Sequence, residues 1–395
     1  MLLYFFLFFL TVFFFFSTVE MHNDEKRQWT NKAFLMGSMI VLALFVGCSD
    51  MLGGYDRYIY CELFDGVADD VTGKLPLMTA QIFKEYPKEQ GYGLYNVLIG
   101  YITTNRYTFV FITTCIIYFL LYQSIKRYCE NYPFAVMLFL GLWFFFTFTY
   151  LRQVLGATIA WLSIKYIIDR SFWRFLFVWF IAYKFHNSAL IFLPMYFIPL
   201  MKIDKKFVLA VMVILLILGL TGAPTALFSA YGEVDVERAK VAGNVTGFRI
   251  AYVIEALFFL YLILSQYDAV PDDPKHVVML NMALVFCGIL LFFVKNENGG
   301  RLSWYYMIGV ISTISYLSTY SAKNVQQTLL MIAVSFILYY RILMAWGSQL
   351  YPYKTFFSDG IRPGDFIEEK YEYDHNYDYD KFYRPSFRFM APKNE

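Results

Sequence analysis

The chain has 395 residues, of which 59% are hydrophobic and only 16% are charged, and its formal net charge is +2. Soluble domains carry about a quarter charged residues, so this composition excludes an ordinary soluble globule and predicts a membrane protein. The near-neutral charge gives no basis for nucleic-acid binding. The 5 cysteines form no Cys-x-x-Cys pair, so neither a disulfide framework nor a metal site is expected.

Apolar runs recur along the chain at the length of a membrane-spanning helix, about 20 residues. They predict an all-α polytopic membrane protein with about twelve transmembrane helices in residues 1–345. Residues 1–19 lack a basic start and a small-residue cleavage site, and are expected to be a retained first span. Further spans are expected near residues 33–48, 107–123, 134–149, 187–200, 207–222, 248–266, 277–294, 302–320 and 325–343, with a hairpin of two more beginning at residue 150.

The hairpin is the most informative stretch. Two apolar runs between Tyr150 and Pro194 are joined by the polar turn Asp169-Arg170-Ser171. A membrane hairpin returns to the side on which it began, so Arg152 and His186 are expected at the same membrane surface.

Polar segments divide the chain into two sides. Residues 49–106 are too polar to span and predict a long first external loop whose last part forms an interfacial helix. A second external loop is expected at 223–247, and a Tyr- and Asp-rich tail at 346–395 is expected to lie on the surface or to move freely. Basic residues gather in the alternate connectors, and the positive-inside rule assigns those connectors to the cytoplasm.

Four ionisable residues recur at span ends on the predicted outer side: Asp56, Arg152, His186 and Arg301. Such residues are functional candidates, although an arginine there could equally be a snorkelling anchor. Arg152 is followed by Gln153 and by small residues at 156, 157 and 160, which let helices pack closely. This context favours an Arg152 side chain that turns into the bundle.

Each of the other candidates has a possible functional role and a simpler, non-functional explanation. Arg301, in the polar stretch KNENGGRLSWYY, could bind a phosphate through two hydrogen bonds, or be an ordinary connector residue. Asp56 lies beside Tyr58 in GGYDRYIYCELF, where a carboxylate among aromatic rings suits sugar binding or general-base work on a hydroxyl. A solvated loop acid is the alternative for Asp56, and an interfacial histidine bonded to backbone or water is the alternative for His186.

Walker A, Gly-x-Ser-x-Gly, His-Glu-x-x-His and dinucleotide motifs are absent from the sequence. Any chemistry therefore needs a substrate that arrives already activated. Six motifs, in this order over residues 35–355, carry a resemblance: GYDRYIY, EQGYGLYNVLIGYI, YLRQVLGATIA, KFHNSALIFLP, GRLSWYY and YPYK. Together they resemble the EpsG-like, Wzy-type polysaccharide polymerases of bacterial envelopes.

The resemblance implies a multi-pass protein of the bacterial cytoplasmic membrane. It would transfer a growing glycan from undecaprenyl diphosphate to the terminal hydroxyl of the next lipid-linked repeat unit, at the outer face. In that reaction Arg152, Gln153, Arg301 and Tyr58 would bind the substrate and its diphosphate, and Asp56 or His186 would take the hydroxyl proton. The expected partners are the lipid-linked oligosaccharide, the bilayer, a chain-length regulator and a flippase, with no cofactor.

Other functions stay open at this point. A ligase that moves finished glycan to another acceptor would use the same donor and the same face. A transporter or flippase of the lipid-linked sugar would need basic residues along a path through the membrane. The charges instead cluster at span ends, with Glu255 as the main exception. A sugar O-acyltransferase would need an acyl-donor site, which the sequence does not indicate.

Overall fold

The computed structural model describes residues 1–19, 21, 24–49, 55–76, 80–221, 223–224, 226–227, 247–296, 299–320, 325–350, 353–357 and 384–390. These residues are mostly helical, and within them the only strand-like pairing is one antiparallel bridge between Ser49 and Thr355. The prediction of an all-helical protein is confirmed.

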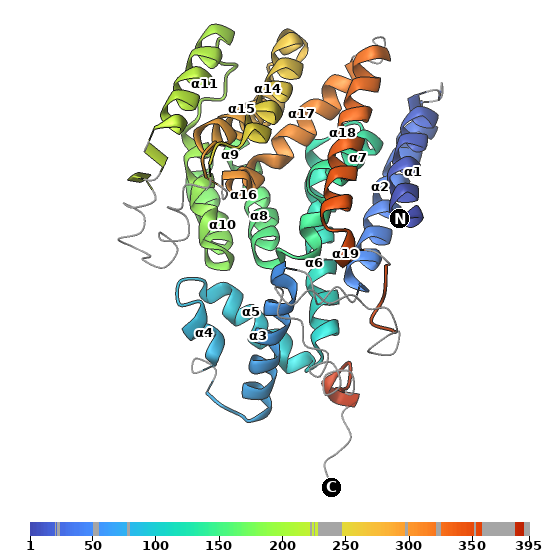
Figure 1. Cartoon of the computed structure of the whole chain (residues 1–395), viewed down its shortest axis with the longest axis vertical. Coiled ribbons are helices and arrows are strands. Elements are labelled where there is room, and N and C mark those ends of the chain that lie inside the picture. The colour runs from blue at the N-terminus through green and yellow to red at the C-terminus, as the bar shows by residue number, and fades with distance from the viewer. Residues whose placement is uncertain are drawn as a thin grey trace.

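Long helices run side by side to form the body of the molecule, and three further helices gather at one end of it (Figure 1). We call these parts the bundle and the cap. The cap consists of α3 (Tyr55–Thr72), α4 (Gln81–Glu85) and α5 (Gln90–Ile102). The first half of the bundle contains α1 (Leu2–Val19), α2 (Asp24–Gly47), α6 (Arg106–Tyr128), α7 (Tyr132–Leu142), η2 (Phe144–Phe148), α8 (Leu151–Leu162), α9 (Ile164–Ile168), α10 (Phe172–Phe185) and η3 (Asn187–Phe197).

The second half of the bundle continues in the same manner and ends in short segments near the cap. It contains α11 (Lys205–Leu220), α14 (Ile250–Ser265), η4 (Tyr267–Ala269), α15 (Pro274–Phe292), α16 (Gly299–Ser303), η5 (Trp304–Tyr306), α17 (Met307–Tyr320), α18 (Val325–Ala345) and α19 (Gly347–Leu350). The short η8 (Arg388–Met390) lies against α5 of the cap.

Four of the described helices are long and apolar enough to cross a membrane. They are α2, α6, α15 and the Thr328–Ala345 part of α18. Shorter apolar helices accompany them at Leu2–Thr18, Tyr132–Leu142, Asn187–Phe197 and Ile250–Ser265. The outer faces of the bundle carry large exposed apolar side chains such as Phe13, Phe207 and Leu257, as expected for contact with lipid. The chain is therefore built as a multi-pass membrane protein, but the count of twelve spans is not confirmed.

Several predicted spans are interrupted in the structure, whereas α2, α6 and α15 are longer than predicted. The predicted span 134–149 consists of α7 and the 3-10 helix η2, which meet at Trp143. The first arm of the hairpin breaks at Ser163, whose hydroxyl donates a hydrogen bond to the Ala160 carbonyl (2.6 Å). The segment 187–200 begins as a 3-10 helix that contains Pro194. Counting apolar residues gives the length of a run but not whether its backbone is continuous.

Helix starts follow ordinary capping chemistry. The Asn105 side chain accepts hydrogen bonds from the backbone NH groups of Tyr107 and Thr108, and so begins α6. Asp273 caps α15 in the same way, with Pro274 in the first turn. Both caps satisfy NH groups that a helix end leaves free.

The segment predicted as a long external loop is largely helical, because α3 fills much of it. Two buried arginines fasten this cap to the bundle. The guanidinium of Arg57 donates to the backbone carbonyls of Val46, Ser49 and Phe148. Arg106 at the start of α6 forms a buried ion pair with Asp65 of α3. The helical cap is thus tied to both α2 and α6.

The connectors that carry the basic residues lie at the end of the bundle away from the cap. Helix α6 begins beside the cap and ends at Tyr128, and Glu130, just after it, pairs with Lys275 at the start of α15. Lys205, which starts α11, pairs with Asp268 after the end of α14. The positive-inside rule, applied to this arrangement, predicts an external cap.

The described parts of the tail return to the cap side. Tyr353 stacks on Phe45 with ring centroids 4.2 Å apart, and Arg384 forms an ion pair with Asp69 of α3 (2.9 Å). Most of the predicted loop 223–247, and residues 358–383 of the tail, lie outside the described residues.

Candidate functional site

The junction of cap and bundle is organised around a buried ion pair between Arg152 and Glu89. Arg152 lies in the first turn of α8, and Nη1 donates to Glu89 Oε2 at 2.5 Å. The other carboxylate oxygen of Glu89 accepts from the backbone NH of Asn187 at 2.9 Å. Glu89 is 1% exposed and directly precedes α5. One carboxylate therefore joins the cap, α8 and the turn between α10 and η3.

Three tyrosine rings enclose the Arg152 guanidinium. Its central carbon lies 3.9 Å from the ring centroid of Tyr86 and 5.9 Å from those of Tyr60 and Tyr92. Such faces attract a cation when water is excluded. The Nε of Arg152 is buried without a hydrogen-bond partner among the described residues. Arg152 thus turns into the protein, as its sequence context favoured, and keeps one donor unused.

The ends of the hairpin lie side by side because α8 and α10 approach closely. A Cβ atom added to Gly156 would lie 3.0 Å from the Cβ of His186. His186 Nδ1 lies 2.5 Å from Ser188 Oγ and accepts from the Ser188 backbone NH at 3.3 Å. The Tyr305 hydroxyl lies 3.0 Å from Ser188 Oγ. His186 therefore caps η3 through Nδ1.

Gln153 and Arg301 form the second part of the site. The Gln153 side-chain amide donates to the backbone carbonyl of Arg301 at 2.9 Å, which fixes α16 beside α8. The Arg301 guanidinium lies over the ring of Tyr150, 4.1 Å from its centroid. Within the described residues Arg301 forms no ion pair.

Asp56, at the start of α3, lies close enough to Arg301 and Arg152 for their charges to act on its carboxyl group. Its backbone NH donates to the Thr149 hydroxyl at 3.0 Å, and the residue is half-buried. Burial raises the pKa of Asp56 above its ordinary value, while the positive charges of Arg301 and Arg152 act in the opposite direction. The structure thus brings Asp56, Arg152, Gln153, His186 and Arg301 to one junction.

Tyr58 lies apart from this group. Its hydroxyl donates to Glu62 at 3.2 Å, and its ring faces Arg106 rather than Arg152. Tyr60, two residues later on α3, is the tyrosine beside Arg152. No group of three metal-ligating side chains occurs in the part of the chain that the structure describes.

Sequence reasoning missed Glu89. It lies 63 positions from Arg152, in a polar segment without a span end to mark it. The available signal was its place just before the apolar-periodic run GYGLYNVLIGYI, where a helix was expected and where a carboxylate suits a helix start.

An apolar groove approaches the site from the side of the bundle. It has a volume of about 320 Å³ and is lined by η3, α11 and α15. Ile191 of η3 and Phe293 after α15 belong to its wall. Phe293 also packs against Gly299, where an added Cβ would overlap it. The wall of the groove thus includes one residue of η3, which His186 caps, and Phe293, which contacts Gly299 at the start of α16.

Apolar helices, a polar helical cap and a buried charge cluster between them define a multi-pass membrane protein with a polar site at one edge of its bundle. The sequence pattern of the EpsG family matches residues 34–355, which is most of the chain. The chain belongs to the EpsG family, and this membership suggests a polysaccharide polymerase-like role. No curated protein and no solved structure matches the chain.

Proposed function

We propose that the protein polymerises a surface polysaccharide such as capsule, exopolysaccharide or O-antigen at the outer face of the bacterial cytoplasmic membrane. A growing glycan on undecaprenyl diphosphate would be transferred to the next lipid-linked repeat unit. The observation that carries the proposal is the convergence of Arg152, Arg301 and Asp56 where cap and bundle meet. Two cations suit a diphosphate, and a carboxylate suits a hydroxyl that loses its proton.

The reaction balances without a cofactor. The acceptor hydroxyl oxygen forms a bond to the anomeric carbon of the growing chain. The bond from that carbon to the diphosphate oxygen breaks, and the lipid diphosphate leaves with the electron pair. A base takes the hydroxyl proton. Stabilisation of the leaving diphosphate is expected to be the largest contribution of the protein.

The two arginines would contribute differently. Glu89 already forms an ion pair with Arg152, whereas Arg301 forms none within the described residues, so Arg301 would supply more of the positive charge for the diphosphate. Arg152 would add its unused Nε donor and keep the cap in place. Asp56 is the favoured base because its carboxyl group lies within range of the charges of both arginines, whereas Nδ1 of His186 is already engaged with Ser188.

The apolar groove beside η3 supports the choice of a lipid-linked donor. Its wall is almost wholly apolar, and it includes one residue of η3 and Phe293, which contacts the start of α16. An isoprenoid chain lying in this groove would enter laterally from the bilayer, with its diphosphate beside Arg301.

The test is a gel profile of lipid-linked glycans from cells that lack the gene, restored with wild type or with Arg301→Ala. Loss of one charged donor to a developing oxyanion costs about 100- to 1,000-fold in rate, so single repeat units should accumulate and long chains should disappear. Arg174→Ala is the matched control, because Arg174 is exposed on α10 near the end away from the cap. Immunoblots of membranes verify equal protein levels.

The profile separates the alternatives. Full-length chains that remain on the lipid carrier would identify a ligase, and repeat units confined to the cytoplasmic leaflet would identify a transporter. Normal polymer from Arg301→Ala would remove Arg301 from the site.

A further inference from the structure

A polar pocket of about 300 Å³ lies at the end of the bundle opposite the cap. Its walls come from the first turns of α2, the end of α6 and the start of α15. The cations Lys32, Lys126, Arg127 and Lys275 line it, with Glu130 as the single carboxylate. The pocket therefore has an excess of positive charge.

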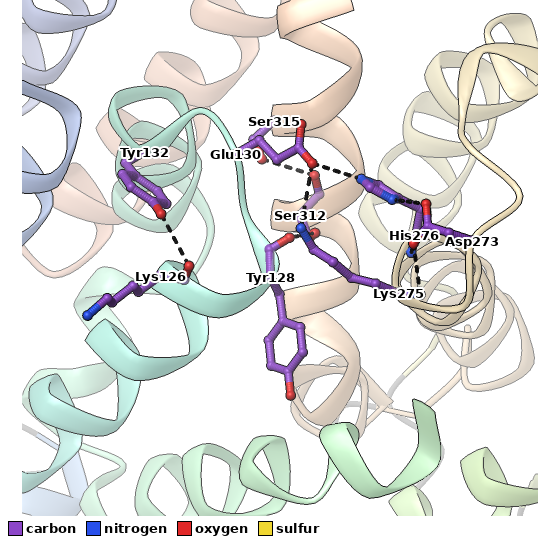
Figure 2. A network of polar contacts seen from close by, with 9 residues as sticks. All are labelled: Lys126, Tyr128, Glu130, Tyr132, Asp273, Lys275, His276, Ser312 and Ser315. Atoms are coloured by element: carbon purple, nitrogen blue, oxygen red, sulfur yellow. Dashed lines mark hydrogen bonds and ion pairs between the residues drawn. The ribbon is translucent and has the colours of Figure 1, made fainter. Parts of the chain in front are cut away.

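Glu130 does not cancel this positive charge, because its carboxylate is already paired with Lys275 and His276 of α15. Both of these contacts lie at the start of α15 (Figure 2). One oxygen of Glu130 lies 3.0 Å from His276 Nε2 and 3.5 Å from Lys275 Nζ. Lys126 and Arg127 instead lie over tyrosine rings of their own helix and form no ion pair within the described residues. Lys32, Lys126 and Arg127 therefore have no carboxylate partner among the described residues and could bind an anion.

The wall that carries Lys126 and Arg127 is fixed in place. Ser312 of α17 donates to the backbone carbonyl of Tyr128 at 2.5 Å, and the Tyr132 hydroxyl donates to the carbonyl of Lys126 at 3.2 Å (Figure 2). The turn after α6 is therefore held by its neighbours before any ligand arrives. A preformed wall lowers the cost of binding.

Topology alone explains basic residues on this side, but not their gathering around a cavity. The pocket also holds Asn31, whose side-chain oxygen is buried and has no hydrogen-bond partner among the described residues. An amide oxygen requires a donor such as a hydroxyl. The lining therefore suits a ligand that combines a phosphate with a hydroxyl group.

We propose that this pocket binds a hydroxyl-bearing phosphate ester. This proposal does not depend on the proposed glycan function. The ligand could be the headgroup of an anionic glycerophospholipid or a free phosphate ester. Helices α2 and α7 also line an apolar groove of about 360 Å³, which includes Trp29 and Val136 and would accept an acyl chain.

The test is a titration of the purified full-length protein with three probes, followed by its intrinsic fluorescence. The probes are short-chain phosphatidylglycerol, short-chain phosphatidylcholine and glycerol phosphate. The variant Lys126→Ala/Arg127→Ala should weaken binding of phosphatidylglycerol about tenfold or more, because it removes two charged donors. The control Lys165→Ala/Arg174→Ala removes the same charge from α9 and α10 and should bind like wild type.

The outcomes separate the sources of the ligand. Competition by glycerol phosphate would show that the headgroup chemistry suffices, whereas binding of phosphatidylglycerol alone would show that the site needs a lipid. Equal affinities in both double variants, or equal binding of phosphatidylcholine, would overturn the proposal. Binding of an acidic peptide in place of every phosphate probe would overturn it in favour of a protein partner.

Discussion

The variant Glu89→Gln tests whether one carboxylate holds the cap to the bundle. The side chains of Arg152 and Glu89 are 10% and 1% exposed. Removing one partner of such a buried pair leaves an uncompensated charge and costs about 3–5 kcal/mol. Glutamine keeps an oxygen for the Asn187 backbone NH, so the change isolates the charge. In larger domains, each kcal/mol of lost stability lowers the melting temperature by about 2 °C or more. The melting temperature of the variant in detergent should therefore fall by about 6–10 °C.

A double-mutant cycle supplies the control. Arg152→Met alone should also destabilise, because it leaves the carboxylate of Glu89 buried and unpaired. The double variant leaves no charge, so it should be less destabilised than the sum of the two single variants. Thermal unfolding followed by tryptophan fluorescence measures all four proteins. An unchanged melting temperature in Glu89→Gln, or additive effects in the double variant, would refute the role of this ion pair.

Three further predictions concern the cap. Gly91→Ala would place a Cβ 3.0 Å from a side chain of α10 and should cost about 1–3 kcal/mol, whereas Gly66→Ala on α3, with open space, should not lower the melting temperature. Asp56 has a raised pKa, so wild type should lose stability relative to Asp56→Asn as the pH rises above about 4, the ordinary pKa of an aspartate; a constant difference would contradict this. In a cysteine-free background, Lys84→Cys should react with an impermeant thiol reagent from outside and Arg174→Cys should not, and the reverse pattern would invert the topology.

Apolar run length predicted where helices occur, because lipid and a packed interior both select apolar residues. It did not predict where they break. The hydroxyl of Ser163 competes for a backbone carbonyl, and His186 begins a 3-10 helix after α10, and neither effect changes the hydropathy of the run. Charges at span ends singled out Arg152 and Arg301, because an ionisable group there requires a partner or water, and the structure gives both of them polar or aromatic contacts.

The contacts of the cap with Arg152 could not be predicted from the sequence. A loop has no helical faces, so the sequence favours Tyr58 only through its place beside Asp56. In helix α3, residues two apart point in different directions, and Tyr60 is the one that meets Arg152. Glu89 meets Arg152 only because the cap packs against α8. Local sequence patterns do not encode this tertiary contact.

Helix α6 has a consequence for communication across the bilayer. At about 1.5 Å per residue its 23 residues span about 34 Å, close to the hydrocarbon thickness of a membrane. Arg106 at one end is locked to the cap, and Arg127 at the other end faces the basic pocket. A continuous helix moves as a rigid rod, so a displacement of its end at the cap also displaces its end at the basic pocket. By thermodynamic linkage, a pocket ligand that changes glycan affinity by some factor has its own affinity changed by the same factor.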